Sequence, residues 1–201
     1  ALIASSPTPI RPGDVFISNN PYNGGTHLPD ITAITPVFIS NSEVTEQKPL
    51  FFVASRGHHA DIGGVTPGSM PPNSQTLEEE GILFDNFHLV DNGTIQEDAL
   101  RQQLASGPYP ARNPAQNLAD LQAQIAANNK GVQELTRMVA QFTLPVVTAY
   151  MQHVQNNAEQ AVRQVIAKLY AAHKEAPLTC QVPMDCGAQV TVTVTLDGDR
   201  N

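Results

Sequence analysis

Short apolar runs in the first part of the chain predict β-strands. Residues 15–17, 31–39 and 50–53 are rich in β-branched and aromatic side chains, which favour extended backbone. A polar stretch over 40–48 separates the second run from the third, so we expect a surface hairpin loop there. Residues 82–90 hold alternating apolar side chains and predict a further short strand.

From residue 114 onward the apolar positions follow the period of an α-helix. Asn113 is a favourable N-cap, and Pro114 suits the first helical position. Pro145 removes a backbone donor and interrupts this helix, and a second apolar stripe runs from Val147 to Leu169. We therefore predict a kinked helix or an antiparallel pair of helices. The buried seam of the first segment comprises Leu118, Leu121, Ile125, Val132, Leu135, Val139 and Phe142, with Asn128 as its single polar member.

The last residues have the pattern of a half-buried strand. Valine or leucine alternates with threonine over 190–196, and Asp197-Gly198 then indicates a hairpin turn. A strand that reaches its turn and stops three residues later lacks the returning strand that would pair with it. We therefore expect the chain to be a piece of a longer protein.

Together these elements predict an α+β fold, with a mixed or antiparallel sheet near the N-terminus and a long helical pair or a kinked helix. We treat residues 1–201 as a single fragment. It divides into a strand- and loop-rich part over 1–112, a helical part over 113–175 and a truncated C-terminal strand over 176–201.

Composition narrows the classes of partner. The 11 Lys and Arg against 19 Asp and Glu give a formal net charge of −8, which argues against nucleic acid as a partner. No apolar run approaches the roughly 20 residues that cross a bilayer, and no signal-peptide pattern opens the chain. We therefore expect no membrane contact and a cytoplasmic location. Cys180 and Cys186 match no common zinc spacing and are too few for a disulfide framework, so we expect free thiols.

Two polar loops rich in glycine carry most of the residues that are able to do chemistry. One spans 19–30, between the first two predicted strands, and the other follows the third strand over 56–64. If these strands are neighbours, the two loops meet at one edge of the sheet. His27, Asp30 and His58 then offer two imidazoles and one carboxylate. This donor set suits zinc, manganese or iron and leaves a position open for water or substrate.

The spacing His-x-x-Asp, on which this site depends, is a weak signal by itself. The match at His88 lies beside a predicted strand, and we interpret that histidine as structural. For the other two matches, glycine lets the backbone fold closely around an ion, yet glycine-rich loops also form plain turns. The residues alone leave a metal site and a structural loop equally open. The three matches are His27/Asp30, His58/Asp61 and His88/Asp91.

Other chemistries have less support. The glycine pairs at 24–25 and 63–64 match neither a phosphate-cradling loop nor a dinucleotide fingerprint. No nucleophile-elbow pattern surrounds a serine. The three glutamates at 78–80 offer a general base raised in pKa by mutual repulsion, although a run of acids is typical of a solvated surface.

Several blocks of the sequence, in order, resemble the hydantoinase B/5-oxoprolinase family, to which acetone carboxylases are related. The likeness runs from residue 13 to about residue 196. Blocks in the right order are far more specific than any single motif. They are Gly-Asp-Val-Phe-Ile at 13–17, Asn-Asn-Pro-Tyr-Asn-Gly-Gly-Thr-His-Leu-Pro-Asp at 19–30, Pro-Val-Phe at 36–38, Gly-His-His-Ala-Asp-Ile-Gly-Gly at 57–64, Pro-Gly-Ser-Met-Pro at 67–71, Glu-Glu-Glu-Gly at 78–81 and the helical segment 117–128.

The resemblance assigns roles to the residues of the two loops. It implies a metal held by His27, Asp30 and His58, with Asp61 and His59 as catalytic residues beside it. Asp61 would hold His58 through its second ring nitrogen. The backbone N–H groups at 63–64 would stabilise a developing oxyanion.

The sequence departs from the family pattern at two positions. The family has an aspartate where Asn20 stands, and an acid where Cys186 stands in the turn over 184–187. The first departure bears on activity if Asn20 replaces a carboxylate that orients a ligand or shapes the loop of the metal site.

The resemblance also implies a reaction. An A-type subunit or domain binds ATP and Mg and phosphorylates the amide oxygen of a small cyclic amide, and the B-type part completes ring opening, as in 5-oxoprolinase or N-methylhydantoinase. We expect this chain to be a fragment of the B-type part, inactive in isolation, within an oligomeric enzyme of glutathione metabolism or hydantoin hydrolysis. Two alternatives stay open: an acetone-carboxylase-like alpha subunit that carboxylates an activated ketone, and a catalytically inactive structural subunit.

Overall fold

The computed structural model describes residues 9–39, 48–68, 71–173 and 177–197. The predicted loop over 40–48 lies outside these ranges except for its last residue, and Gly198 of the predicted turn also lies outside them. The chain forms two compact units, residues 1–137 and residues 138–201, which are described separately.

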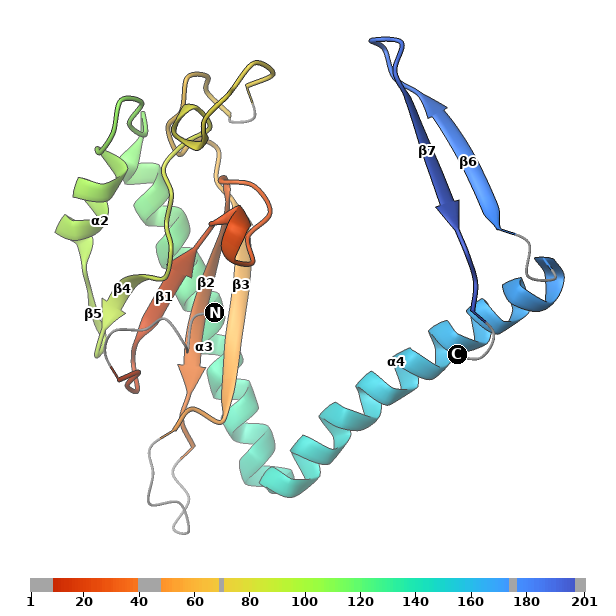
Figure 1. Cartoon of the computed structure of the whole chain (residues 1–201). Helices are drawn as coiled ribbons and strands as arrows, with labels where there is room; N and C mark the ends of the chain where they lie inside the picture. Colours follow the sequence, from red (N-terminus) through yellow and green to blue (C-terminus); the bar gives the residue numbers. More distant parts are fainter. Residues whose placement is uncertain (1–8, 40–47, 69–70, 174–176, 198–201) are drawn as a thin grey trace. The chain divides into compact units, whose positions relative to one another are not determined.

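A five-stranded antiparallel sheet forms the centre of the first unit (Figure 1). The order across the sheet is β3-β2-β1-β4-β5, and every neighbouring pair is antiparallel. The α+β class and the antiparallel form of the sheet are thereby confirmed. The strand expected over 82–90 is shorter and begins at Phe87. The strands are β1 (Val15–Ser18), β2 (Asp30–Val37), β3 (Phe51–His58), β4 (Phe87–Asp91) and β5 (Thr94–Ile95).

Helix α3 (Pro114–Phe142) covers one face of this sheet. The Asn113 side chain accepts from the backbone N–H of Gln116 at 3.3 Å, which confirms the predicted cap. Leu118 and Leu121 enter a continuous apolar core with the inner residues of the strands. Burial of this core is the main stabilising contribution to the unit. Two 3-10 turns, η1 (Pro21–Asn23) and η2 (Leu77–Glu79), and a short helix, α2 (Glu97–Leu104), complete the unit.

Buried amide side chains tie α3 to the sheet. The Nδ2 atom of Asn128 donates to the carbonyl of Ala33 at 3.0 Å and to Oγ1 of Thr35 at 3.1 Å. The Nε2 atom of Gln124 donates to the carbonyls of Ile31 at 3.0 Å and Ser55 at 3.1 Å. A buried amide must find such partners, so these bonds fix the position of α3 relative to β2 and β3.

The second unit contains the end of α3, the helix α4 (Leu144–His173) and the strands β6 (Leu178–Pro183) and β7 (Gln189–Val194). Helix α3 ends before Thr143, whose φ of +71° interrupts the helical backbone, and Pro145 lies in the first turn of α4, where its missing N–H costs nothing. The structure thus gives two helices at the predicted break.

Strand β7 corrects the expectation of an unpaired C-terminal strand. It pairs along its whole length with β6, from Leu178 opposite Val194 to Pro183 opposite Gln189. The sequence pattern did not predict β6. The valines of β7 are exposed within the described residues, so the strand is not half-buried there. Cys180 and Cys186 are exposed and unpaired, as predicted.

Among the described residues, no helix combines the length and the apolar character that a bilayer crossing requires.

Candidate metal centre

The loop that carries His27 is fixed at its base by Asn19. The Nδ2 atom of Asn19 donates to the carbonyls of Leu28 at 2.7 Å and Ile82 at 2.9 Å. Its Oδ1 accepts from the backbone N–H of Phe84 at 2.6 Å. Asn19 is fully buried, and a buried amide with three hydrogen bonds holds both ends of the loop in one arrangement. No sequence pattern indicated this role of Asn19.

Asn20 shapes the turn that follows. Its Oδ1 accepts from the backbone N–H of Tyr22 at 2.9 Å, which caps η1, and its Nδ2 donates to Asp85 at 3.1 Å. Asn23 donates to the other oxygen of Asp85 at 2.8 Å. An aspartate at position 20 would therefore set two carboxylates against each other at this point.

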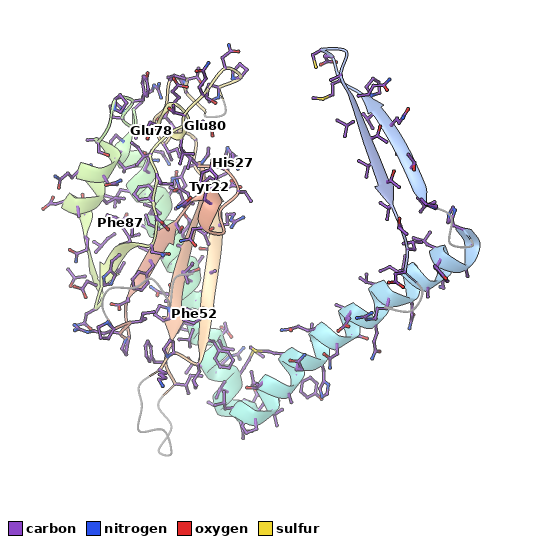
Figure 2. All side chains as sticks on the ribbon, in the orientation of Figure 1. Tyr22, His27, Phe52, Glu78, Glu80 and Phe87 are labelled. Carbon is purple, nitrogen blue, oxygen red and sulfur yellow. The ribbon has the colours of Figure 1, made fainter. Side chains whose placement is uncertain are left out.

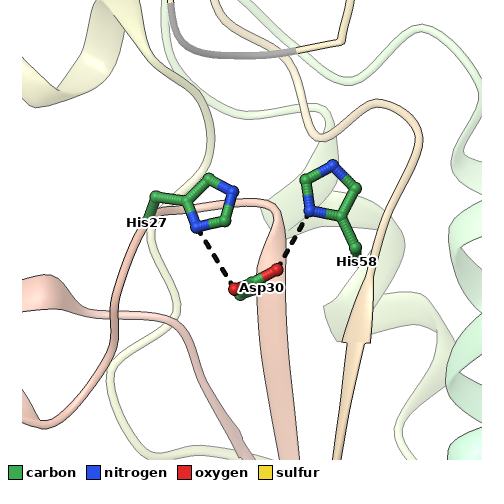
Figure 3. Close-up of side chains that lie close together, drawn as sticks. All are labelled: His27, Asp30 and His58. Carbon is green, nitrogen blue, oxygen red and sulfur yellow. Dashed lines mark hydrogen bonds and ion pairs between the residues drawn. The ribbon is translucent and has the colours of Figure 1, made fainter.

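Strand pairing brings together the three predicted metal ligands (Figure 3). Asp30 is the first residue of β2 and stands opposite His58, the last residue of β3. The Oδ1 atom of Asp30 lies 3.0 Å from Nδ1 of His58, and its Oδ2 atom lies 3.2 Å from Nδ1 of His27. The two imidazole rings are 5.2 Å apart, with 38° between their planes. One carboxylate thus bridges two histidines that lie 31 positions apart in the sequence.

The cluster is partly open to solvent. The exposed fractions of the side chains are 28% for His27, 21% for Asp30 and 58% for His58. Tyr22 and His27 lie at the end of the sheet where β1 finishes and β2 begins, while Phe52 lies toward the other end (Figure 2). A ligand can therefore reach the cluster from outside the first unit.

Hydrogen bonds keep Asp30 ionised. Partial burial would raise the pKa of this carboxyl group, but the bond with His58, the bond from Oγ1 of Thr26 at 2.9 Å and the charges of the two histidines outweigh burial. The net result is a pKa below the ordinary value of 3.8. Asp30 is thus an anion at neutral pH, the form that a metal needs.

The donor set fits a divalent transition metal. Metal–nitrogen and metal–oxygen bonds of about 2.0–2.2 Å place neighbouring donor atoms roughly 3.0–3.5 Å apart in octahedral or tetrahedral geometry. The two observed separations, 3.0 and 3.2 Å, lie in this range. Candidate donor atoms from all three side chains lie within 4.8 Å of one another. His27, Asp30 and His58 would hold the ion.

His59, predicted as catalytic, directly follows the last residue of β3 and is buried. Its side chain is only 2% exposed, and the two ring nitrogens face α3. Nε2 lies 3.1 Å from Oε1 of Gln124, and Nδ1 lies 3.3 Å from Nδ2 of Asn117. Burial lowers the pKa of the imidazole, although the bond to Gln124 and the charge of Asp120 act in the other direction. Both nitrogens are therefore engaged in packing the helix against the sheet.

Asp61, the other predicted catalytic residue, is bound to Arg112. Its Oδ2 accepts from Nη1 of Arg112 at 2.8 Å, and its Oδ1 accepts from the backbone N–H groups of Gly63 at 3.0 Å and Arg112 at 3.1 Å. Burial would raise the pKa of Asp61, but these bonds and the guanidinium charge lower it. The contact with His58 that the resemblance implied is replaced by this ion pair.

The glycine pair at 63–64 does not supply oxyanion donors. The N–H of Gly63 is bound to Asp61, and the N–H of Gly64 donates to the carbonyl of Tyr109 at 3.0 Å. Both residues have φ near +90°, and a Cβ atom on Gly63 would lie 2.3 Å from the Tyr109 carbonyl oxygen. The pair is needed for close chain packing, which corrects the expectation of an anion-stabilising loop.

Two other predicted groups have structural contacts. The carboxylate of Glu79 caps the start of η2 by accepting from the backbone N–H of Thr76 at 3.4 Å, and it also accepts from that of Gln75 at 2.6 Å. Glu80 accepts from Oγ of Ser74 at 2.9 Å. His88 stacks on Phe16 at 4.6 Å, in agreement with its structural interpretation. Its Nε2 lies 3.2 Å from buried Asp14, without hydrogen-bond alignment. His88, Asp14 and Asp91 nevertheless form a second group with donor atoms close enough for a cation.

Comparison with known proteins gives the family. Residues 1–201 match the family described as hydantoinase B/oxoprolinase. The chain belongs to this family. The 5-oxoprolinase of Dictyostelium discoideum is 42% identical over 193 residues, which is 94% of this chain and 14% of that protein. The chain therefore spans about one seventh of the length of this curated relative.

Two solved structures share the fold of this chain. The ATP-dependent caprolactamase from Pseudomonas jessenii superposes with a TM-score of 0.73 at 23% identity, over 94% of this chain and 31% of that one. Nucleotide-free acetone carboxylase superposes with a TM-score of 0.59 at 21% identity, over 92% of this chain and 24% of that one. At these identities the likeness establishes the fold.

Proposed function

We propose that this chain forms the metal-binding part of the B-type region of an ATP-dependent cyclic amide hydrolase, in which the ring of an activated lactam or imide is opened. The observation that carries the proposal is the bridging of His27 and His58 by the Asp30 carboxylate at a solvent-accessible end of the sheet. The similarity to a 5-oxoprolinase supports the class of substrate.

The reaction needs help because an amide is a poor electrophile. A divalent metal polarises a carbonyl or lowers the pKa of bound water to near neutrality. Asp30 would contribute an anionic oxygen, and His27 and His58 would each contribute a ring nitrogen of a neutral imidazole. Thr26 orients Asp30 through its hydroxyl hydrogen bond.

The two residues first expected to be catalytic have positioning roles in this proposal. His59 holds the end of β3 against α3 and so fixes the direction in which its neighbour His58 points. Asp61 and Arg112 hold the segment that follows β3 through an ion pair at 2.8 Å. Neither requires contact with the substrate.

ATP chemistry is assigned to a partner. Neither glycine pair of this chain has a following Lys-Ser or Lys-Thr for phosphate binding. We therefore assign ATP and Mg to an A-type subunit or domain, which would deliver the phosphorylated cyclic amide to the cluster formed by His27, Asp30 and His58.

The experiment is an activity assay on the intact enzyme that contains this chain, with ATP and either 5-oxoproline or hydantoin. His27→Ala and His58→Ala should each lower turnover by more than about 100-fold, because removing a metal ligand costs at least as much as removing a residue that supports one. His173→Ala, an exposed histidine of α4, is the matched control and should keep full activity.

The assay also separates the alternatives. A ring-opened product formed with water supports the hydrolase. Incorporation of bicarbonate into a ketone would instead indicate an acetone-carboxylase-like reaction. Full activity of both ligand variants would place the chain among structural subunits.

A further inference from the structure

One cationic side chain, that of Arg56, lies beside the candidate metal centre. Arg56 is paired with Thr32 across β2 and β3, and the next pair on the same face is Asp30 with His58. Alternate residues of a strand lie on one face about 6.6–6.8 Å apart. Arg56 is exposed, like His58, and its guanidinium group therefore shares the outer face of the sheet with the metal ligands.

The guanidinium group is held in place from two sides. Its Nε donates to Oγ1 of Thr32 at 2.8 Å, and its Nη2 lies 3.5 Å from the carbonyl oxygen of Gly24. Gly24 belongs to the loop that carries His27. The second contact is at the limit of a hydrogen bond, so most donors of the terminal fork have no strong partner among the described residues.

Arg56 also differs from most of the other arginines in the described part of the chain. Arg101, Arg112 and Arg137 each make an ion pair with a carboxylate at 2.7–2.8 Å. Arg56 has no such partner there, although the chain carries 19 acidic residues and a net charge of −8. An oriented cation without an acidic partner is available to bind an external anion.

We propose that Arg56 binds an anionic group of the substrate next to the metal centre, and this inference rests on the proposed function. The group is a carboxylate on the ring of the cyclic amide or the phosphoryl group of its activated form. The planar fork of arginine matches either one. The distance along the sheet from the Asp30–His58 pair to the Thr32–Arg56 pair is comparable with the size of a small ring. A ring whose carbonyl lies at the metal ligands can therefore place its anionic group at Arg56.

The alternative is that Arg56 only ties the loop to the strand through Gly24 and Thr32. A tether of this kind would affect metal content and thermal stability, and it would affect charged and uncharged ligands equally. Binding of an anion is selective for charge, so a pair of ligands with and without the anionic group separates the two roles.

The test measures binding by titration calorimetry on the intact, metal-loaded enzyme without ATP. The ligands are 5-oxoproline, 2-pyrrolidinone, which has the same ring without the carboxylate, and inorganic phosphate. Arg56→Met should weaken the binding of 5-oxoproline or of phosphate by about 10–100-fold, the effect of losing a hydrogen bond to a charged group. The affinity for 2-pyrrolidinone, the metal content and the melting temperature should stay unchanged. Arg56→Lys should give an intermediate affinity, and Arg101→Met should behave as wild type.

The two anionic ligands identify the source of the anion, and weaker binding of either one supports the proposal. A loss confined to 5-oxoproline identifies the ring carboxylate, and a loss confined to phosphate identifies the phosphoryl group. Unchanged affinity for both anions overturns the proposal, as does an equal loss for 2-pyrrolidinone accompanied by loss of metal. If the enzyme binds anions through Arg56 yet opens no cyclic amide, the proposed function fails and the anion site stands.

Discussion

Two adjacent histidines should respond in opposite ways to substitution. His59→Ala removes a ring that is 2% exposed and leaves Oε1 of Gln124 without its donor. The Gln124 amide cannot turn to compensate, because its Nε2 atom is bound to two backbone carbonyls. An unsatisfied buried acceptor costs about 1–3 kcal/mol, and the cavity left by the ring adds to this. We expect a total of about 3 kcal/mol. His58→Ala truncates a side chain that is 58% exposed and should cost less than about 0.5 kcal/mol.

Hydrogen exchange of the intact protein measures the difference in stability between the two variants at the amides of β3 and α3. With a chelator present, so that bound metal does not contribute, His59→Ala should lower the protection of amides in β3 and the first half of α3 by about 100-fold. His58→Ala should leave that protection unchanged while it abolishes metal binding. The reasoning is refuted if His59→Ala keeps wild-type protection and loses only activity, because His59 would then act chemically, as the family resemblance first implied.

Further predictions concern the segment after β3. Asp61→Asn should cost about 2 kcal/mol at neutral pH. Because the pKa of folded Asp61 lies below 3.8, its stabilising contribution is present above pH 3.8 and is lost as the pH falls through the folded value. The gap between wild type and variant in urea unfolding should therefore close in acid; a gap independent of pH would contradict the ion pair with Arg112. Gly63→Ala should cost more than about 3 kcal/mol, because of its φ of +91° and the clash with Tyr109. Gly68→Ala, with φ of +80° and open space, should cost about 1 kcal/mol, and equal losses in thermal unfolding would disprove the packing argument.

Local patterns predicted much of the fold. The runs at 15–17 and 31–39 and the cap at Asn113 correspond to elements of the structure, because period-two and helical patterns need no knowledge of distant residues. Helix α2 was missed because it is only eight residues long. Strand β6 was missed because its partner, and not its own sequence, selects its extended form.

The proximity of His27, Asp30 and His58 could be predicted from the sequence for a physical reason. His27 and Asp30 flank the start of one strand and His58 ends the next, so antiparallel pairing alone brings them together. The roles of His59 and Asp61 could not be predicted in this way. Their partners, Gln124 and Arg112, lie 65 and 51 positions away, and no local spacing indicates which polar residue packs against which.

The most direct test of the metal proposal is anomalous X-ray scattering from crystals of the intact enzyme, at the absorption edges of zinc, manganese and iron. We predict one strong peak about 2.0–2.2 Å from donor atoms of His27, Asp30 and His58, and its loss in Asp30→Ala crystals grown in the same way. An enzyme that is active yet shows no peak at these residues, or whose only peak lies at Asp14, His88 and Asp91, would contradict the account.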